Sequence, residues 1–308
     1  MTVLILGGSG FLGRAVVDQL RDEDTELVTA DVDVGDVDPV DSETVIECDV
    51  TKYDQLAEAI ERFEPTRIVH LAYIGASSDR FPSKAARVNC VGVDNVLRAA
   101  VEYDIERVAY ASSGAVYGGP GTYASDDPVD ETTEPPAAFT QYPLLLYTAM
   151  KHLNEYQSRL YADRDDLSVA AVRPAFIFGP GYEAAYTQWA SDLVEKPLDG
   201  EEVTIPFPPN KPIPLVYRDD AARLFVELLF ADDLRHHSYN TGGYAVTPRE
   251  LAETIEREIG GTVTCLPGAD PAPFVSDMSH ERAQREFGFE LPSLPTAVRR
   301  NADAVRSR

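Results

Sequence analysis

The sequence predicts an α/β fold, a doubly wound parallel sheet with a smaller C-terminal α/β lobe. Short apolar runs typical of buried strands alternate with helical segments as far as about residue 180. The first run passes directly into a glycine-rich turn and a helix, and beyond residue 180 the pattern changes to helices with short strands. We therefore expect one unit over residues 1–179 and a second over residues 180–308, with the chain crossing between them.

The first strand is expected at residues 2–6, and a helix follows at residues 14–20. Between them Gly7, Gly10 and Gly13 have the spacing G-x-x-G-x-x-G. Glycines in such a turn let the backbone approach a pyrophosphate, and the helix N-terminus offers free N–H groups and the positive end of its dipole. A tight strand-to-helix turn would need glycine too, but this order of elements favours a dinucleotide site.

The second strand, expected at residues 26–30, ends at Asp31. A carboxylate at this point accepts hydrogen bonds from the hydroxyls of an adenosine ribose and repels a 2′-phosphate. Asp31 therefore favours NAD over NADP. Arg14, directly after the glycine turn, would act against that preference.

The remaining elements follow from the same alternation of apolar runs and helical periodicity. A capping box at Thr247 and Glu250, with Pro248 at the first helical position, marks one helix start. Further strands are expected at residues 44–47, 67–71, 107–111 and 168–172, and further helices at residues 52–63, 82–103, 144–161, 219–230 and 248–258.

Tyr147 and Lys151 stand four residues apart within an expected helix, which places both side chains on one face. An ammonium near a phenol favours the phenolate, and a tyrosine poised in this way is a general base for an alcohol. An exposed helix face would show the same spacing. Ser113 follows the strand at residues 107–111 and is expected at the ligand-binding edge of the sheet, opposite this helix.

Together these motifs resemble the extended short-chain dehydrogenase/reductase family, of the NAD-dependent epimerase/dehydratase type, whose fold is the Rossmann fold. The resemblance covers nearly the whole chain. It rests on GGSGFLG at residues 7–13, Asp31, CDV at 48–50, HLA at 70–72, NCVGVDNVL at 89–97, SSGAVYG at 112–118, Y-x-x-x-K at 147–151 and RPAFIFGP at 173–180.

By resemblance, Tyr147 is the catalytic acid/base, Lys151 lowers its pKa and holds the nicotinamide ribose, and Ser113 binds the reacting oxygen. Residues 1–179 are then the dinucleotide-binding domain and residues 180–308 the substrate-binding lobe. The resemblance implies NAD as cofactor, no metal, and these cofactor-binding residues: Gly7, Gly10, Phe11, Leu12, Gly13, Asp31, Asp49, Val50, Leu71, Ala72, Asn89, Tyr147, Lys151 and Pro174.

The sequence departs from members that act on nucleoside-diphosphate sugars at two positions. Those members usually carry an asparagine where Phe176 stands and an arginine where Ile213 stands. Both missing groups normally contact the diphosphate, which needs such partners. Lys211, Arg218 or Arg223 could substitute, but a smaller sugar, sugar acid or hydroxy acid gains weight. Its carboxylate would be expected to use Arg173, Arg218 or Arg223.

Three functions stay open. The first is hydride transfer at a secondary alcohol of a sugar-like or sugar-acid-like substrate, with NADH released. The second is a UDP-hexose 4-epimerase that retains NAD, and the third is a non-catalytic NAD sensor on the same fold. Dehydration is the least favoured chemistry, because Gly114 follows Ser113 where dehydratases carry an acid.

The composition predicts an environment. The chain has 308 residues and a net charge of −25, with 52 acidic residues against 27 lysines and arginines. Five of the 27 are lysines. Such a surface is typical of a halophilic cytoplasm, where salt screens self-repulsion, although an ordinary cell can also hold an acidic protein. It argues against nucleic acid as a partner.

The three cysteines, Cys48, Cys90 and Cys265, are far apart and lack metal-site spacing, an intracellular pattern. The apolar start at residues 3–6 is too short for a signal peptide or a membrane span. We expect a cytoplasmic protein without membrane contact.

Three stretches of the sequence are expected to form loops. The acidic stretch 31–41 lacks the ligand order of a calcium loop. The long stretch 118–143 lies between Ser113 and Tyr147 and is either a lid over the substrate or an acidic surface excursion. The proline-rich stretch 206–214 is better explained as a rigid connector than as a recognition peptide.

A homodimer is the expected assembly, because members of the family pair through the helices matching residues 88–103 and 147–161. Both helices carry apolar residues on more than one face, and a sheet covers only one. The residues concerned are Val96, Leu97, Val101, Leu153, Tyr156 and Leu160.

Overall fold

The computed structural model describes residues 1–21, 23, 25–35, 39, 41–75, 77–125, 127–136, 144–181 and 187–307. The chain forms two compact units, each built from three segments. The first unit comprises residues 1–116, 142–173 and 222–239, and the second comprises residues 117–141, 174–221 and 240–308.

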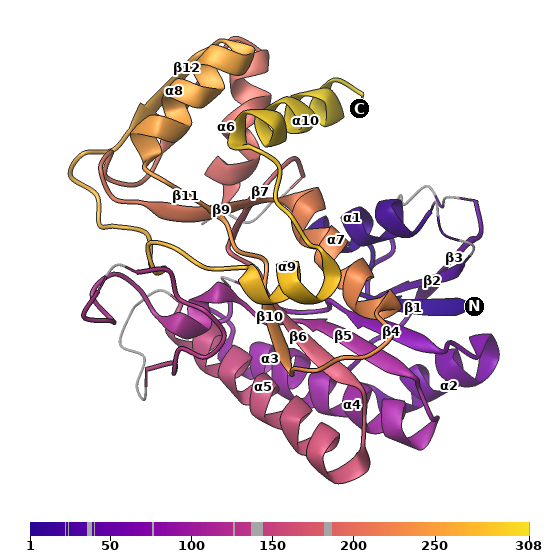
Figure 1. Cartoon of the computed structure of the whole chain (residues 1–308). Coiled ribbons are helices and arrows are strands. Elements are labelled where there is room, and N and C mark those ends of the chain that lie inside the picture. The colour runs from indigo at the N-terminus through magenta and orange to yellow at the C-terminus, as the bar shows by residue number, and fades with distance from the viewer. Residues whose placement is uncertain are drawn as a thin grey trace. The chain divides into compact units, whose positions relative to one another are not determined.

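The first unit is built on a seven-stranded sheet in the order β10-β6-β5-β4-β1-β2-β3 (Figure 1). The strands from β1 to β6 pair in parallel. Their bounds are β1 Thr2–Leu6, β2 Glu26–Asp31, β3 Glu43–Glu47, β4 Arg67–His70, β5 Arg107–Ala111, β6 Val169–Arg173 and β10 Ser238–Asn240. The strand order reverses between β1 and β4, and in open α/β sheets ligands bind at the carboxyl ends of the strands flanking such a point.

Helices cover both faces of this sheet (Figure 1). Helices α2 (Tyr53–Phe63), α4 (Val93–Glu102) and α5 (Leu145–Asp165) lie on one face, and α1 (Phe11–Leu20) lies on the other. This arrangement confirms the expected fold class, a doubly wound α/β fold.

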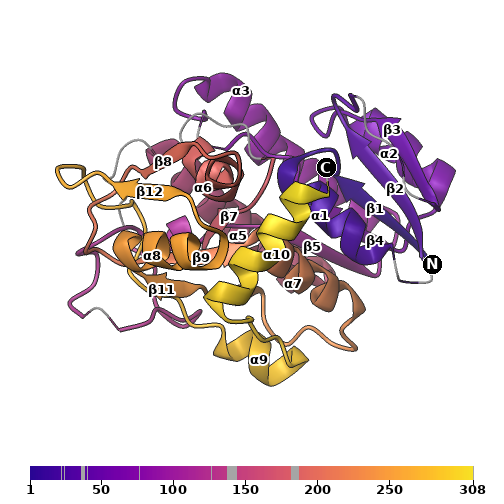
Figure 2. The same cartoon turned by 90° about the horizontal axis from the view of Figure 1, so that it is seen from above.

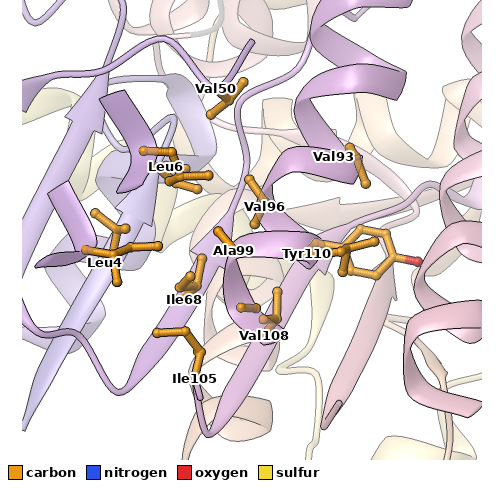
Figure 3. Packing of buried hydrophobic residues seen from close by; sticks show 14 of the residues in the cluster. Leu4, Leu6, Val50, Ile68, Val93, Val96, Ala99, Ile105, Val108 and Tyr110 are labelled. Atoms are coloured by element: carbon orange, nitrogen blue, oxygen red, sulfur yellow. The ribbon is translucent and has the colours of Figure 1, made fainter. Parts of the chain in front are cut away.

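The core of the first unit lies between the sheet and the helices α2, α4 and α5. Leu4, Leu6, Ile68 and Val108 contribute side chains from the strands, and Val96 contributes one from α4 (Figure 3). All five are at most 1 % exposed. Because both faces of the sheet are covered, its central strands β1 and β5 are buried along nearly their whole length, whereas the edge strand β3 is not.

The second unit contains two small sheets. One has the order β11-β9-β7, and the other pairs β8 with β12. Helices α6 and α8 pack on β8 and β12, and α10 packs against both helices (Figure 2). The bounds are β7 Phe176–Phe178, α6 Gln188–Leu198, β8 Glu202–Ile205, β9 Ile213–Tyr217, β11 Tyr244–Val246, α8 Pro248–Ile259, β12 Thr262–Cys265, α9 Glu281–Phe287 and α10 Leu294–Arg306.

The helix expected over residues 82–103 is present from Pro82 to Glu102, but it is not a regular α-helix throughout. It consists of α3 (Pro82–Ala86), a π-helical turn η1 (Arg87–Gly92) and then α4. The π-helical turn contains Asn89, whose fully buried amide binds the backbone of Ile74, fifteen residues earlier in the chain. A π-helical turn of this kind often accompanies a functional site.

Two other elements differ from expectation. Helix α1 begins at Phe11, inside the glycine turn, and α7 (Arg218–Phe230) contributes residues to both units. The functional division at residue 179 stays a prediction. Among the described residues, no helix combines the length and the apolar character that a membrane crossing requires.

Candidate active site

The glycine turn packs directly against the segment that follows β4. Gly7 has a φ of +81°, and a Cβ atom there would lie 2.4 Å from the backbone nitrogen of Ala72. The nitrogens of Leu71 and Ala72 both donate to the Leu6 carbonyl, at 2.7 and 3.0 Å. Only glycine fits at this position. The predicted cofactor residues Gly7, Leu71 and Ala72 are therefore neighbours at the switch point of the sheet.

Gly13 lets helix α1 approach the turn. A Cβ atom at Gly13 would lie 2.3 Å from the Gly7 carbonyl oxygen. Gly10 precedes the helix and has no side chain, so no N-cap side chain occupies the N-terminal end of α1, whose first residues are Phe11 and Leu12. This arrangement fits a pyrophosphate at the helix N-terminus.

Asp31 ends β2, the strand beside β1. Its Oδ1 accepts a hydrogen bond from the Val32 nitrogen at 2.8 Å. Burial raises the pKa of this carboxyl above its usual value, and hydrogen bonds from neighbouring backbone nitrogens oppose that shift. Its place at the carboxyl end of β2 is the one expected of a ribose acceptor.

Arg14 is held by a partner that the sequence did not suggest. Its guanidinium nitrogens lie 2.7 and 3.3 Å from the two carboxylate oxygens of Glu43, the first residue of β3. The Glu43 carboxylate is fully buried and also accepts a hydrogen bond from the Thr29 hydroxyl at 2.5 Å. An acid that engages Arg14 in this bidentate way reduces the positive charge available near Asp31.

Asp49 and Val50, which are expected to bind the cofactor, follow β3. The Asp49 carboxylate accepts hydrogen bonds from the backbone nitrogen and the hydroxyl of Thr51, at 3.0 and 2.7 Å. Val50 is 4 % exposed, and a Cβ atom at Gly92 would lie 2.7 Å from its Cγ2. Both residues are thus fixed in place.

Asn89 acts on the backbone in this structure. Its Oδ1 accepts a hydrogen bond from the Ile74 nitrogen at 2.8 Å, and its Nδ2 donates to the Ile74 carbonyl at 2.9 Å. The Asn89 carbonyl accepts a hydrogen bond from Asn154 of α5 at 2.7 Å. Asn89 therefore ties the segment after β4 to the helix that carries Tyr147 and Lys151.

Ser112 and Ser113 differ in their surroundings. The Ser112 hydroxyl donates to Glu155, whose carboxylate forms a bidentate pair with Arg173 at 2.8 and 2.6 Å. Burial raises the pKa of Glu155, but the Arg173 guanidinium and the hydrogen bonds outweigh burial and leave it below its usual range. The Ser113 hydroxyl accepts a hydrogen bond from the Ala115 nitrogen at 3.1 Å. Ser113 is therefore the serine that this buried ion pair does not engage.

This ion pair also corrects one expectation. Arg173 is 7 % exposed at its side chain and its guanidinium fork is matched by Glu155, so it does not serve as a partner for a substrate carboxylate. Arg218 lies 2.9 Å from Asp219 and donates to the Pro180 carbonyl at 3.0 Å. The Arg223 guanidinium lies 4.0 Å from Glu227.

Lys151 follows Tyr147 by one helical turn on α5, and its side chain is buried. Its Nζ donates to the Ala111 carbonyl, at the end of β5, at 2.5 Å, and lies 5.7 Å from the centre of the Tyr147 ring. Burial lowers the pKa of the Lys151 ammonium well below its ordinary value, and the Glu155 charge partly offsets this. The Lys151 ammonium thus contacts the last residue of β5, and Ser113 follows that residue by two positions.

Two residues beside this pair were not singled out by sequence reasoning. Tyr73 lies edge-on to Tyr147, with ring centres 5.7 Å apart. His70 is fully enclosed, and burial together with the Lys151 charge lowers its pKa to about 3. Neither His70 ring nitrogen has a hydrogen-bond partner among the described residues. The sequence indicates these two residues only by position. His70 directly precedes Leu71, and Tyr73 directly follows Ala72, and both of these neighbours are expected to bind the cofactor.

In the second unit, the two positions that depart from nucleotide-sugar members are apolar core. Phe176 is 4 % exposed, and its ring centre lies 5.1 Å from that of Trp189 and 5.3 Å from that of Phe274. Ile213 begins β9 and is 1 % exposed. Pro174, expected near the cofactor, is a buried residue of this unit.

Two loops lie partly outside the described residues. The expected lid 118–143 includes residue 126 and residues 137–143, and the acidic stretch 31–41 includes residues 36–38 and 40. The lid stays a prediction.

Known proteins with two kinds of activity are similar to this chain. A Methanocaldococcus jannaschii protein that carries the provisional name UDP-glucose 4-epimerase is 28 % identical over 268 residues, covering 84 % of this chain and 82 % of its own length. The mitochondrial L-threonine 3-dehydrogenase of Bos taurus is 24 % identical, covering 96 % of this chain and 81 % of its own length.

Similarity extends to solved structures. The Thermus thermophilus UDP-glucose 4-epimerase in complex with NAD superposes with a TM-score of 0.83 at 23 % identity, covering 99 % of each chain. The sequence profile of the NAD dependent epimerase/dehydratase family matches residues 3–242. This match confirms the expected cofactor NAD, whose pyrophosphate the glycine turn fits. The chain belongs to the NAD dependent epimerase/dehydratase family.

Proposed function

We propose that the protein is an NAD-dependent dehydrogenase that transfers a hydride at a secondary alcohol of a small sugar-like, sugar-acid-like or hydroxy-acid substrate. The observation that carries this proposal is the arrangement of Tyr147 and Lys151 on α5 with Ser113 at the end of β5. These groups belong to one unit whose sheet also presents the glycine turn.

Each residue has a chemical role in the proposed reaction. The Tyr147 phenolate takes the proton of the substrate hydroxyl, and Lys151 stabilises that phenolate. The Ser113 hydroxyl donates to the substrate oxygen as it becomes a carbonyl. Bound NAD supplies the hydride acceptor. In the reverse direction Tyr147 returns its proton to the oxygen.

The aromatic cluster around Phe176 supports a small substrate. A nucleoside diphosphate needs cationic or hydrogen-bonding partners, and Phe176 and Ile213 supply neither. The similarity to L-threonine 3-dehydrogenase points the same way, because threonine is a small acid with a secondary alcohol.

A UDP-hexose 4-epimerase is the second candidate, since the similarity to UDP-glucose 4-epimerases is equally broad. Such an enzyme would oxidise and re-reduce the same substrate without releasing NADH. A non-catalytic NAD sensor is the remote third candidate, and the presence of Ser113, Tyr147 and Lys151 together argues against it.

Two measurements separate the candidates. Free NADH should accumulate when NAD is mixed with the correct member of a panel of sugar acids, aldoses and hydroxy acids that includes L-threonine. In thermal unfolding of the NAD-bound protein, 1 mM UDP should give no protection, whereas a ligand with a dissociation constant of about 10 μM would add about 2.7 kcal/mol. Protection by UDP-sugars without NADH accumulation would establish the epimerase instead.

A further inference from the structure

The ring of Tyr73 forms one wall around the Lys151 ammonium. The Lys151 Nζ atom lies 3.3 Å from the centre of the Tyr73 ring, over its face. The same ring meets Tyr147 edge-on at 5.7 Å between centres. Tyr73 therefore contacts both members of the proposed catalytic pair, from a segment that Asn89 holds in place at the neighbouring Ile74.

The ammonium has few other favourable contacts. Lys151 is 2 % exposed, so it has lost most of its hydration. Its Nζ donates to the Ala111 carbonyl at 2.5 Å. Glu155 is an acid on the same helix, but its carboxylate is already paired with Arg173. The negatively polarised face of an aromatic ring stabilises a desolvated cation, most strongly where water is excluded.

We propose that Tyr73 is a positioning residue that keeps the proton shared by Tyr147 and Lys151 on the lysine. Lys151 is buried and Tyr147 is half-buried, with the Lys151 Nζ atom 5.7 Å from the centre of the Tyr147 ring. Two ionisable groups this close titrate as a pair, and the pair can lose its first proton from either member. Stabilising the ammonium favours the state with a Tyr147 phenolate over the state with a neutral lysine. This inference rests on the proposed role of Tyr147 as general base.

Other ionisable groups lie on the elements around Tyr147 and Lys151. None of them stabilises the Lys151 ammonium in the way that the face of the Tyr73 ring does. His70, at the end of β4, is neutral at physiological pH because its pKa is about 3. Glu155 forms a bidentate pair with Arg173, and its charge favours the Lys151 ammonium only in part. Cys90 on η1 and Tyr110 on β5 interact electrostatically with Tyr73, and His152 on α5 interacts with Glu155 and Arg173.

A purely space-filling role for Tyr73 makes a different prediction, because it depends on ring volume and not on ring electrostatics. Phenylalanine analogues with increasing numbers of ring fluorines at position 73 keep the volume nearly constant while the negative face is progressively lost. They remove the attraction for the ammonium without opening a cavity.

The test is the ionisation of Tyr147 in the NAD-free protein, followed by the near-ultraviolet absorbance of phenolate during a pH titration. Subtracting the curve of Tyr147→Phe isolates Tyr147 from the 14 other tyrosines, since the chain has 15. Tyr73→Phe should keep the midpoint close to that of the natural protein. Each added fluorine should move the midpoint to higher pH, by about one unit in total.

Two further variants complete the experiment. Tyr73→Met, which fills similar space without a ring, should show the full shift. Tyr53→Leu removes a different ring, at the start of α2, which lies 4.0 Å from the Arg98 guanidinium, and should show no shift. A midpoint that does not move across the fluorinated series overturns the proposal.

This outcome is separable from the proposed function. The absorbance titration needs neither NAD nor substrate, so it gives a result even if the protein is no dehydrogenase. Conversely, loss of turnover in Tyr147→Phe together with an unmoved fluorinated series would leave the dehydrogenase standing and remove Tyr73 from its machinery.

Discussion

Tyr147 and Lys151 lie one helical turn apart on α5, and the proposed chemistry depends on the phenol. Tyr147→Phe removes only the hydroxyl, and its ring keeps the contact with Tyr73. We expect turnover to fall at least about a hundredfold, the scale of a lost general acid/base. NAD affinity, measured by titration calorimetry, should stay within a factor of about two. Full activity in this variant would remove Tyr147 from the mechanism.

Asp31 and Glu43 are expected to set the preference for NAD together. Asp31 faces the ribose hydroxyls in the proposed site, and Glu43 engages Arg14, which would otherwise attract a 2′-phosphate. We expect NAD to bind at least about tenfold more tightly than NADP. Asp31→Ser should bring the two dissociation constants together, and adding Glu43→Gln should lower that for NADP further. Equal affinities in the natural protein would contradict this account.

His70 links the site to the pH dependence of stability. Its folded pKa is about 3, below the unfolded value of 6.5, so its neutral form stabilises the folded protein fully above pH 6.5 and this contribution is lost as the pH falls towards 3. At pH 5 the loss should be about 2 kcal/mol. In urea unfolding, His70→Leu should show a smaller loss between pH 7 and pH 5. His237→Ala, at an exposed position, is the control and should keep the full loss.

At the scale of elements, α5 presents an apolar stripe outward. Leu153, Tyr156 and Leu160 are 43, 63 and 55 % exposed, and Val91 of η1 is 50 % exposed. Of the apolar residues named on the two helices, Val96 and Leu97 are 1 % exposed and belong to the face that packs in the core. A helix pattern cannot by itself tell which apolar face meets the sheet.

This stripe is the surface through which we propose that the chain forms a homodimer. Tyr156→Glu combined with Leu160→Glu should weaken dimerisation at least about a hundredfold, since charges would replace apolar area buried in the pair. Light scattering across a concentration series measures the change. Leu266→Glu alters an equally exposed apolar residue of the second unit and should leave the assembly as it is. A natural protein that is monomeric at all concentrations would refute the dimer.

Elements fixed by local signals were predicted well from the sequence. Strands β1 and β5 have the expected bounds, and the glycine turn lies at the switch point as expected. The features that the sequence did not predict depend on contacts between residues that are distant in the sequence. The π-helical turn contains Asn89, which binds Ile74, and Arg14 pairs with a buried acid on β3. Neither partner is visible in a local pattern.

The same limit applies to the candidate site. The carriers of the proposed chemistry, Ser113, Tyr147 and Lys151, were found because their types and spacing signal a reaction. Tyr73, His70 and the pair of Glu155 with Arg173 were missed, because single buried residues of these types are ordinary in any core. Only the folded structure shows that Tyr73 contacts Lys151 and that Arg173 pairs with Glu155 on the helix that carries Tyr147 and Lys151.

At the scale of the whole molecule, charge should govern stability. A net charge of −25 makes the folded chain repel itself, and unfolding relieves that repulsion. Salt shortens the screening length from about 10 Å at 0.1 M to about 3 Å at 1 M. Ion pairs such as that of Arg98 with Glu102 weaken at the same time, but exposed pairs contribute little. The acidic excess should therefore decide the sign of the salt effect.

We accordingly propose that the protein is adapted to concentrated salt and expect its urea unfolding midpoint to rise between 0.1 and about 2 M KCl. Sucrose at matched osmolality controls for effects unrelated to charge, and should raise the midpoint less. Neutralising two exposed acids by Glu58→Gln and Glu253→Gln should raise the midpoint at 0.1 M and reduce its dependence on KCl. A midpoint that stays constant or falls with KCl would show that self-repulsion does not limit stability, and the proposed adaptation would fail with it.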